Sequence, residues 1–140
     1  MASEFTLTRR VEFSETDMAG IMHFSNYYRF MEGAEHAFIR SLGLTIFEKT
    51  AAPAIGWPRV ACSCEYKRPL KFEDLVDIHL TVAKKTEKAI TYSFAFRKSG
   101  EPEICATGSV TVVCCTIREG RMQATFIPKE FAEKIDVHPG

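Results

Sequence analysis

The stretch from Asp17 to Tyr27 holds the side chains whose types and spacing are best suited to chemistry. The carboxylate of Asp17 stands a few residues before Ser25, a residue type that often caps the start of a helix. A helix start offers unpaired backbone N–H groups and a partial positive charge, which can stabilise an oxyanion developing on a carbonyl. The carboxylate can then attack that carbonyl or activate a water. These parts suffice to hydrolyse an activated acyl group, and a thioester suits them best because a thiolate leaves without a strong acid.

Taken singly, the residues of this stretch have ordinary structural interpretations. Asp17 could bond its own backbone in a turn, and Gly20 could supply the positive φ of that turn. A lone His23 is more often a surface histidine or one with satisfied hydrogen bonds than a catalyst, and Asn26 suits a helix start. Their combination is what favours acyl transfer. The chain has no Gly-x-Ser-x-Gly elbow that would suggest another mechanism of this kind.

The element that must position these residues is an amphipathic helix beginning near Ser25. Apolar residues recur at steps of three and four and form one stripe, and Gly43 is typical of the residue just after a helix. Gly33 lies in the middle of the helix at a cost of about 1 kcal/mol relative to Ala, which predicts that something packs closely there. The stripe consists of Tyr27, Phe30, Met31, Ala34, Phe38 and Leu42.

The remainder of the chain alternates in the manner of long strands. Residues 44–58 are loop-like, turns are predicted at 99–102 and 119–120, and Pro128 could begin a short helix that ends near Ile135. One helix followed by three or four long antiparallel strands predicts an α+β architecture, with a long curved sheet wrapped around one helix. The predicted strands span 5–13, 60–66, 74–84, 89–98 and 104–117, and the last is apolar on both faces, as suits a central strand.

Composition narrows the class of protein further. The chain has 140 residues, which fits a single domain over 1–140. Its 18 basic and 18 acidic side chains cancel, so no bulk positive field attracts nucleic acid or anionic lipid. No apolar run approaches the ~20 residues of a membrane helix, and the N-terminus has no apolar signal core. Five cysteines, an odd number without an export signal, predict a reduced, cytoplasmic protein.

Two motifs resemble those of a known family. The pattern D-x-x-G-x-x-x-x-x-N-Y-x-x-x-x-E resembles the signature of the hotdog-fold acyl-CoA thioesterases, and more narrowly that of the 4-hydroxybenzoyl-CoA thioesterase family. Residues 66–74 are similar to that family's Y-x-R-P-L-x-x-x-D stretch, and the order of elements matches over residues 5–117. The resemblance implies a hotdog fold and a hydrolase that releases a free acid and coenzyme A. The first pattern is carried by Asp17, Gly20, Asn26, Tyr27 and Glu32.

The resemblance also implies a role for each matching position. Asp17 matches the carboxylate proposed in the family as nucleophile or general base, and Gly20 matches the glycine of the following turn. The backbone N–H of Phe24 matches the helix-start donor of the oxyanion hole. Asn26 and Tyr27 match the pair that shapes the site. All five positions are therefore expected in or beside the active site.

One departure from the family concerns His23. Several relatives place a histidine at the position that Phe24 occupies here, one step later in the chain. The shifted imidazole can point elsewhere, so the Phe24 backbone is preferred to the His23 side chain as a catalytic group. A catalytic role for His23 is kept as a hypothesis.

Coenzyme A carries phosphates that need positive groups at the mouth of a site. Lys84, Lys85 and Lys88 cluster at the hairpin tip predicted for residues 85–88, and the family often uses basic residues of this hairpin for the nucleotide. A solvated turn is the alternative interpretation, and Lys67 and Arg68 are further candidates for the same role.

The single tryptophan and the cysteines have weaker signals. Trp57 could line an acyl pocket or anchor its loop. The Cys62-x-Cys64 and Cys114-Cys115 pairs do not match the spacing of zinc ligands. We therefore predict that the cysteines pack in the core as small apolar residues, and that the protein holds no metal.

Three functions remain in view. The first is an acyl-CoA thioesterase whose partner is a thioester of coenzyme A or of acyl carrier protein, with no separate cofactor because coenzyme A belongs to the substrate. The second is a non-hydrolytic hotdog protein that binds acyl thioesters, although a pure binder has little use for Asp17. The third is a hotdog dehydratase or hydratase, which would pair a histidine with a carboxylate.

The sequence does not fix the acyl group of the substrate, and aromatic, short aliphatic and 3-oxo acyl groups are all compatible with it. Because family members dimerise with each site between subunits, and many form tetramers, the resemblance implies a homodimer or homotetramer.

Overall fold

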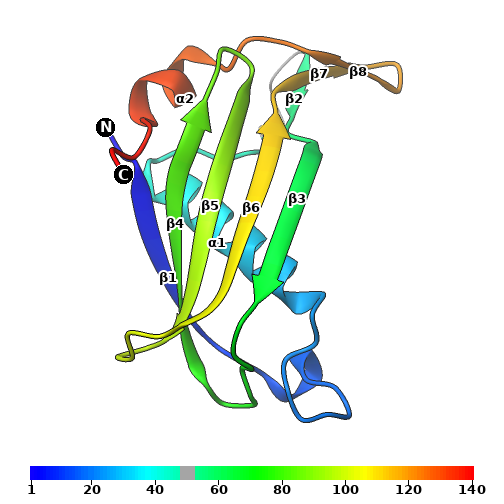
Figure 1. Ribbon diagram of the computed structural model, residues 1–140. Helices are drawn as coiled ribbons and strands as arrows, with labels where there is room; N and C mark the ends of the chain where they lie inside the picture. Colours follow the sequence, from blue (N-terminus) through cyan, green and yellow to red (C-terminus); the bar gives the residue numbers. More distant parts are fainter. Residues whose placement is uncertain (48–52) are drawn as a thin grey trace.

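The computed structural model describes residues 1–47 and 53–140, and its main element is a five-stranded antiparallel sheet packed on one long helix (Figure 1). The strands lie in the order β1-β4-β5-β6-β3, so β1 and β3 form the two edges. This is the α+β arrangement that the sequence predicts. The elements are β1 (Glu4–Arg10), α1 (Asn26–Ser41), β3 (Arg59–Tyr66), β4 (Leu75–Lys85), β5 (Ala89–Lys98) and β6 (Ile104–Val113).

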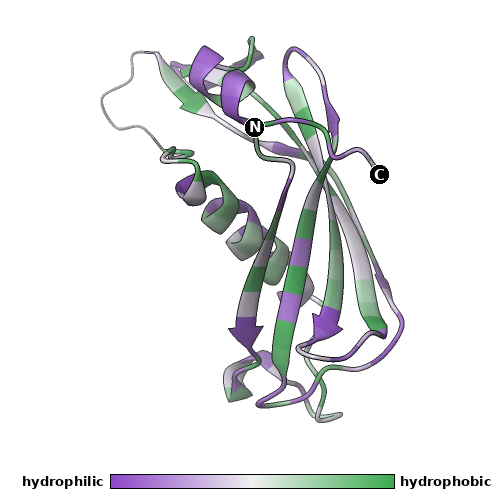
Figure 2. Cartoon of the chain, turned by 90° about the vertical axis from the view of Figure 1, so that its left-hand side faces the viewer, coloured by the Kyte–Doolittle hydropathy of each residue, from purple (hydrophilic) through white to green (hydrophobic). Residues whose placement is uncertain are grey.

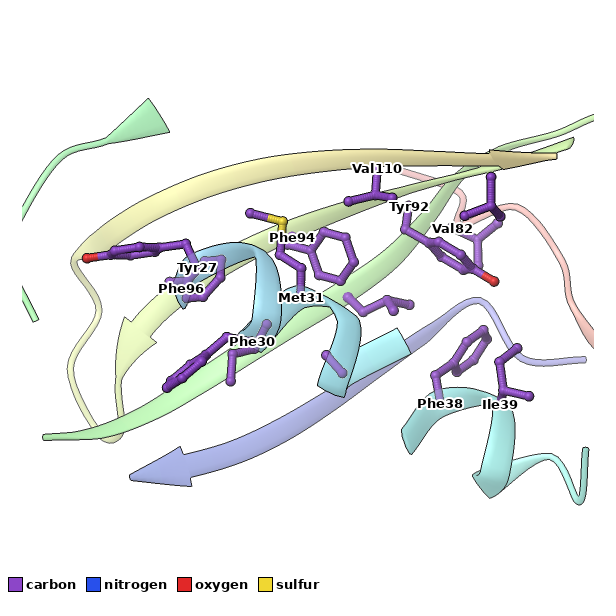
Figure 3. Packing of buried hydrophobic residues seen from close by; sticks show 14 of the residues in the cluster. Tyr27, Phe30, Met31, Phe38, Ile39, Val82, Tyr92, Phe94, Phe96 and Val110 are labelled. Carbon is purple, nitrogen blue, oxygen red and sulfur yellow. The ribbon is translucent and has the colours of Figure 1, made fainter. Parts of the chain in front are cut away.

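The core lies between α1 and the face of the sheet that it covers (Figure 2). The alternation predicted in β4 is confirmed, since Val76, Ile78, Leu80 and Val82 are fully buried. The apolar stripe of α1 meets this face, and the ring of Phe38 lies 6.3 Å from that of Tyr92 on β5 (Figure 3). Burial of such large side chains is the main driving force that holds the helix on the sheet.

The first strand ends earlier than the sequence predicts. β1 stops at Arg10, and a 3₁₀ turn, η1 (Phe13–Glu15), follows, which leaves Phe13 three-quarters exposed. Arg9 interrupts the apolar face of the strand because its guanidinium lies 4.0 Å from the centre of the buried Phe30 ring. The same guanidinium pairs with the buried Glu15 and so draws the chain into the turn.

The strand predicted over 104–117 is two strands. β6 ends at Val113, and the Cys114 N–H donates to the Lys88 carbonyl at 2.7 Å, which directs the chain away from the main sheet. β7 (Cys115–Arg118) then pairs with β2 (Ala54–Gly56) and β8 (Arg121–Ala124) in a small second sheet. Part of the loop predicted over 44–58 is thus the strand β2, and residues 48–52 lie outside the described residues. The predicted C-terminal helix is confirmed as α2 (Lys129–Lys134).

The glycines show where α1 approaches its neighbours. Gly43, with φ +76°, ends the helix as predicted. The prediction of close packing at Gly33 is wrong, because a Cβ built there would meet Leu7 at an ordinary 3.7 Å. The close approach lies instead on β6, where a Cβ at Gly108 would lie 2.2 Å from the terminal methyl of Met31.

All five cysteines are free, and most of them pack as predicted. Cys105, Cys114 and Cys115 are buried, and burial raises the pKa of the Cys114 thiol to about 11. Cys62 is exposed, so its predicted place in the core is wrong; β3 is an edge strand and its Cys62 is left uncovered. In residues 1–47 and 53–140 no group of potential ligands could hold a metal, and no helix is long and apolar enough to cross a membrane.

Candidate active site

Asp17 lies at the tip of a small hairpin that precedes α1. Its N–H donates to the Ile21 carbonyl at 3.0 Å, and its own carbonyl accepts from Gly20 N–H at 2.9 Å. Gly20 has φ +81°, which confirms the predicted turn glycine and explains why a residue without a Cβ stands there. The Met22 N–H donates to the Leu70 carbonyl at 2.7 Å and so attaches the hairpin to the segment after β3.

The Asp17 carboxylate is exposed and held by one local hydrogen bond. Its Oδ1 accepts from the Ala19 backbone N–H at 2.8 Å, the turn contact that the sequence allowed as the ordinary interpretation. No donor from the described part of the chain reaches its Oδ2. One carboxylate oxygen is therefore held by the turn, while the other is available for chemistry. A structural role of Asp17 in the turn and a chemical role of its carboxylate are thus compatible.

The backbone donors at the start of α1 differ in whether the described residues offer them a partner. The Asn26 N–H donates to the His23 carbonyl at 2.9 Å, and the Ser25 N–H donates to the His23 ring at 3.3 Å. Among the residues that the structure describes, no acceptor is within reach of the Phe24 N–H. This N–H lies just before the helix, where the dipole of α1 favours negative charge.

His23 has a structural part at the helix start. Its Nδ1 accepts from the Ser25 N–H and lies 2.8 Å from the Ser25 hydroxyl, while its ring contacts that of Phe24 at 4.5 Å between centres. The side-chain cap that Ser25 was predicted to supply is absent, and the Ser25 hydroxyl meets the His23 ring instead. These contacts give the imidazole a local partner and favour the Phe24 backbone as the chemical group.

Asn26 joins the helix start to the turn that precedes the Asp17 hairpin. Its buried side-chain N–H donates to the Glu15 carbonyl at 2.8 Å, and its Oδ1 accepts from Arg29 at 2.9 Å. The His23 N–H donates to the same Glu15 carbonyl at 2.9 Å. Asn26 and the His23 N–H thus tie the start of α1 to the turn that precedes the Asp17 hairpin.

A hollow of about 510 Å³ opens beside this helix start. One wall contains Tyr27, whose ring meets that of Tyr66 edge-on at 4.8 Å, and the Tyr66 hydroxyl donates to the Phe24 carbonyl at 3.3 Å. Burial raises the pKa of Tyr27 to about 12, so its phenol stays neutral and serves as a wall. The residues lining the hollow are Ala19, Ile21, Met22, Phe24, Tyr27, Tyr66, Lys67, Arg68 and Pro69.

Lys67 and Arg68 line this hollow, whereas the β4–β5 hairpin with its three lysines, called the lysine hairpin below, lies elsewhere. The β4–β5 hairpin with Lys84, Lys85 and Lys88 lies at the opposite end of the sheet from the Asp17 hairpin (Figure 1). A strand as long as β4 spans about 35 Å, so in one chain these lysines cannot share a ligand with Asp17. Lys85 moreover donates to two carbonyls at the end of α2, at 2.9 and 2.7 Å.

Trp57 is also remote from the hollow. Its ring packs against Phe131 of α2 at 5.2 Å between centres, so of the two predicted roles the structure favours the anchor of the loop. The residue that the sequence analysis missed is Tyr66, which contacts both Phe24 and Tyr27. Its signal was its place at the head of the Y-x-R-P-L stretch and at the end of a strand.

Comparison with known proteins shows the family of this chain. The chain belongs to the thioesterase-like superfamily, whose sequence profile matches residues 11–135. It is 33% identical over 129 residues to a putative esterase of Aquifex aeolicus (strain VF5), covering 92% of this chain and 95% of that protein. It is 30% identical over 102 residues to a 1,4-dihydroxy-2-naphthoyl-CoA hydrolase of Prochlorococcus marinus (strain NATL1A), covering 68% of each.

Solved structures share the fold over nearly the whole chain. A gentisyl-coenzyme A thioesterase matches with a TM-score of 0.80 and 30% identity, over 91% of this chain and 99% of that one. A 4-hydroxybenzoyl CoA thioesterase complexed with 4-hydroxybenzoyl CoA matches with a TM-score of 0.84 and 21% identity, over 94% and 98%. These likenesses confirm the predicted hotdog fold, the predicted family and the predicted class of enzyme, a thioester hydrolase.

Proposed function

We propose that the protein hydrolyses an acyl-CoA thioester at the hollow beside the start of α1. One observation carries the proposal: Phe24, whose N–H has no partner in the described chain, lines this hollow, and the Asp17 hairpin borders it through Ala19 and Ile21. The thioester oxygen would accept from the Phe24 N–H, and negative charge developing on it would be stabilised by the helix dipole.

Two routes from this arrangement to the free acid are open. In the first, the Asp17 carboxylate attacks the thioester carbon, the C–S bond breaks, and water then hydrolyses the mixed anhydride. In the second, Asp17 removes a proton from a water that attacks directly, and the coenzyme A thiolate leaves. A single turnover in ¹⁸O-labelled water tests the first route, because label appears in the Asp17 carboxylate only if water attacks the aspartyl carbon of the anhydride.

The proposed acyl group is aromatic. Three of the proteins named above act, according to their names, on gentisyl-, 4-hydroxybenzoyl- and 1,4-dihydroxy-2-naphthoyl-CoA. The hollow of this chain has aromatic side chains in its wall, Tyr27 and Tyr66 among them, which suit a flat ring. We assign no step to a metal or a separate cofactor, since Asp17, the Phe24 N–H and water supply the whole reaction.

Lys67 and Arg68 are proposed to hold the phosphates of coenzyme A at the mouth of the hollow. Replacing both with Gln is expected to raise KM for an acyl-CoA at least ~10-fold, the equivalent of about 1.4 kcal/mol, with little change in kcat. Steady-state kinetics test this, with Lys129→Gln on the exposed face of α2 as control. An unchanged KM would remove the assignment and direct attention to Lys84, Lys85 and Lys88 of a second copy.

A second copy is proposed to join along β3. This edge strand presents uncovered apolar side chains, with Val60 59% and Tyr66 47% exposed. Unpaired strand edges are ready templates for pairing with another chain. Light scattering of the purified protein is expected to give two or four times the 15.8 kDa of one chain, and a mass of one chain would contradict the pairing.

A further inference from the structure

One buried carboxylate close to the candidate site takes no part in the proposed catalytic steps, that of Glu15 in the turn η1. Glu15 is only 8% exposed, whereas the nearby Asp17 is open to solvent. Its Oε1 accepts from the Glu12 N–H at 2.8 Å, and the Glu15 N–H donates back to the Glu12 carbonyl at 3.0 Å. The carboxylate therefore closes the turn in which Glu15 itself lies, two residues before Asp17.

The second oxygen of this carboxylate pairs with Arg9 at the end of β1. The Arg9 guanidinium also lies 4.0 Å from the centre of the Phe30 ring, and Phe30 is fully buried in the second turn of α1. Arg9 thus joins η1 to β1 and to α1 at the same time. With both of its oxygens engaged, one of them by a charged donor, the Glu15 carboxylate is held firmly.

The backbone carbonyl of Glu15 is the place where the two parts of the candidate site meet. It accepts from the His23 N–H at 2.9 Å and from the Asn26 side chain at 2.8 Å. Asp17 follows Glu15 by two residues, and Phe24 follows His23 by one. The Asp17 carboxylate and the Phe24 N–H are therefore each connected to the same peptide group through at most two residues of chain.

We propose that Glu15, held by Arg9, is a positioning residue for the hydrolysis and sets the place of the Asp17 carboxylate relative to the Phe24 N–H. This role rests on the proposed function, which assigns those two groups to the reaction. The donor binds the thioester oxygen, so the carboxylate, or the water that it activates, has to reach the carbon bonded to that oxygen. A misplacement of about 1 Å can lower the rate of such a reaction about 100-fold.

A purely structural role of the Arg9–Glu15 pair is the alternative. Such a role has weak physical support, because the desolvation of two buried charges offsets most of their attraction. The two roles also differ in what a substitution changes. A structural pair alters the fraction of protein that is folded, whereas a positioning pair alters kcat of the folded protein and does so only while Asp17 is present.

The first variant is Glu15→Gln, which keeps the size of the side chain but leaves it one acceptor oxygen for two donors. We expect kcat for the hydrolysed acyl-CoA to fall about 10- to 100-fold with little change in KM. Arg9→Gln breaks the pair from the side of β1 and should give a similar loss. Arg9→Lys keeps the positive charge beside Glu15 and should retain most of the wild-type kcat. Single-turnover thiol release with the enzyme in excess measures all three.

The decisive comparison repeats Glu15→Gln in the Asp17→Asn protein. No carboxylate then remains to be positioned, so the further loss should be about 3-fold or less, well below the loss in the wild type. The matched control is Glu35→Gln, which neutralises another buried carboxylate paired with an arginine. Its effect on kcat, whatever its size, should be the same with and without Asp17.

Melting temperatures and circular dichroism show which variants are folded, and Arg9→Gln is judged by the same criteria if Glu15→Gln does not fold. An undiminished kcat in the folded variants, or the same fold-loss with and without Asp17, would overturn the inference. Failure of the proposed function shows separately, because Asp17→Asn alone would then leave thiol release unchanged or the wild type would release none.

Discussion

Asp17→Asn is expected to lower kcat/KM for the hydrolysed acyl-CoA at least ~100-fold. The amide neither attacks a thioester carbonyl nor removes a proton from water, so the loss follows on either route. The substitution keeps the shape of the side chain, and its amide oxygen can still accept from the Ala19 N–H. The hairpin should therefore remain in place, and the effect should appear in kcat more than in KM.

The measurement for this prediction is steady-state thiol release by the two proteins at equal concentration, with their melting temperatures compared. Asp77→Asn is the matched control, since this carboxylate on β4 accepts from the Thr8 hydroxyl and lies outside the site. Retention of a third or more of the wild-type rate by a folded Asp17→Asn protein would show that another group supplies the nucleophile or base.

The second large effect is expected from the backbone of Phe24. Replacing residue 24 with phenyllactic acid exchanges its N–H for an ester oxygen and keeps the side chain. Loss of one oxyanion donor lowers kcat by about 10²–10³-fold, and we expect this range with little change in KM because the donor acts most strongly in the transition state. Rapid-quench kinetics on the semisynthetic protein measure it.

A matched ester at residue 25 controls for the general effect of backbone exchange. The Ser25 N–H is already engaged by the His23 ring, so its loss should disturb the helix start without removing the oxyanion donor. Comparable losses at residues 24 and 25 would mean that the Phe24 N–H has no special part. The comparison also bears on His23, because the control removes the hydrogen bond from the Ser25 N–H to its ring and keeps the contact with the Ser25 hydroxyl.

Much of the fold can be read from local patterns. The three- and four-residue steps from Tyr27 onward give α1, the alternation in residues 74–84 gives β4, and the positive φ of Gly20 gives the hairpin that presents Asp17. These features depend on neighbours in sequence, for which periodicity and turn chemistry are reliable guides. An unpaired N–H near the start of α1 belongs with them, since helix starts leave donors without intrahelical partners, whereas the choice of Phe24 as that donor came from the family resemblance.

Features set by distant contacts could not be read in this way. β1 ends early because the Arg9 guanidinium lies over the Phe30 ring and pairs with the Glu15 carboxylate. The chain turns at Cys114 because its N–H donates to the Lys88 carbonyl. The lysine hairpin carries the expected charge, but only the sheet topology shows that it lies at the opposite end from Asp17. Exposure of Cys62 likewise follows from the position of β3 at the edge, which alternation alone does not reveal.

The most direct test of the account is thiol release by the wild-type protein from a panel of coenzyme A esters. The panel contains benzoyl, 4-hydroxybenzoyl, short and long aliphatic, and 3-oxoacyl thioesters, each followed to the free acid. We predict hydrolysis of an aromatic ester, with one thiol released per acid formed and the activity lost in Asp17→Asn. Absence of thiol release from every ester, or release that Asp17→Asn leaves intact, would contradict the assignment of a thioesterase site to Asp17 and the start of α1.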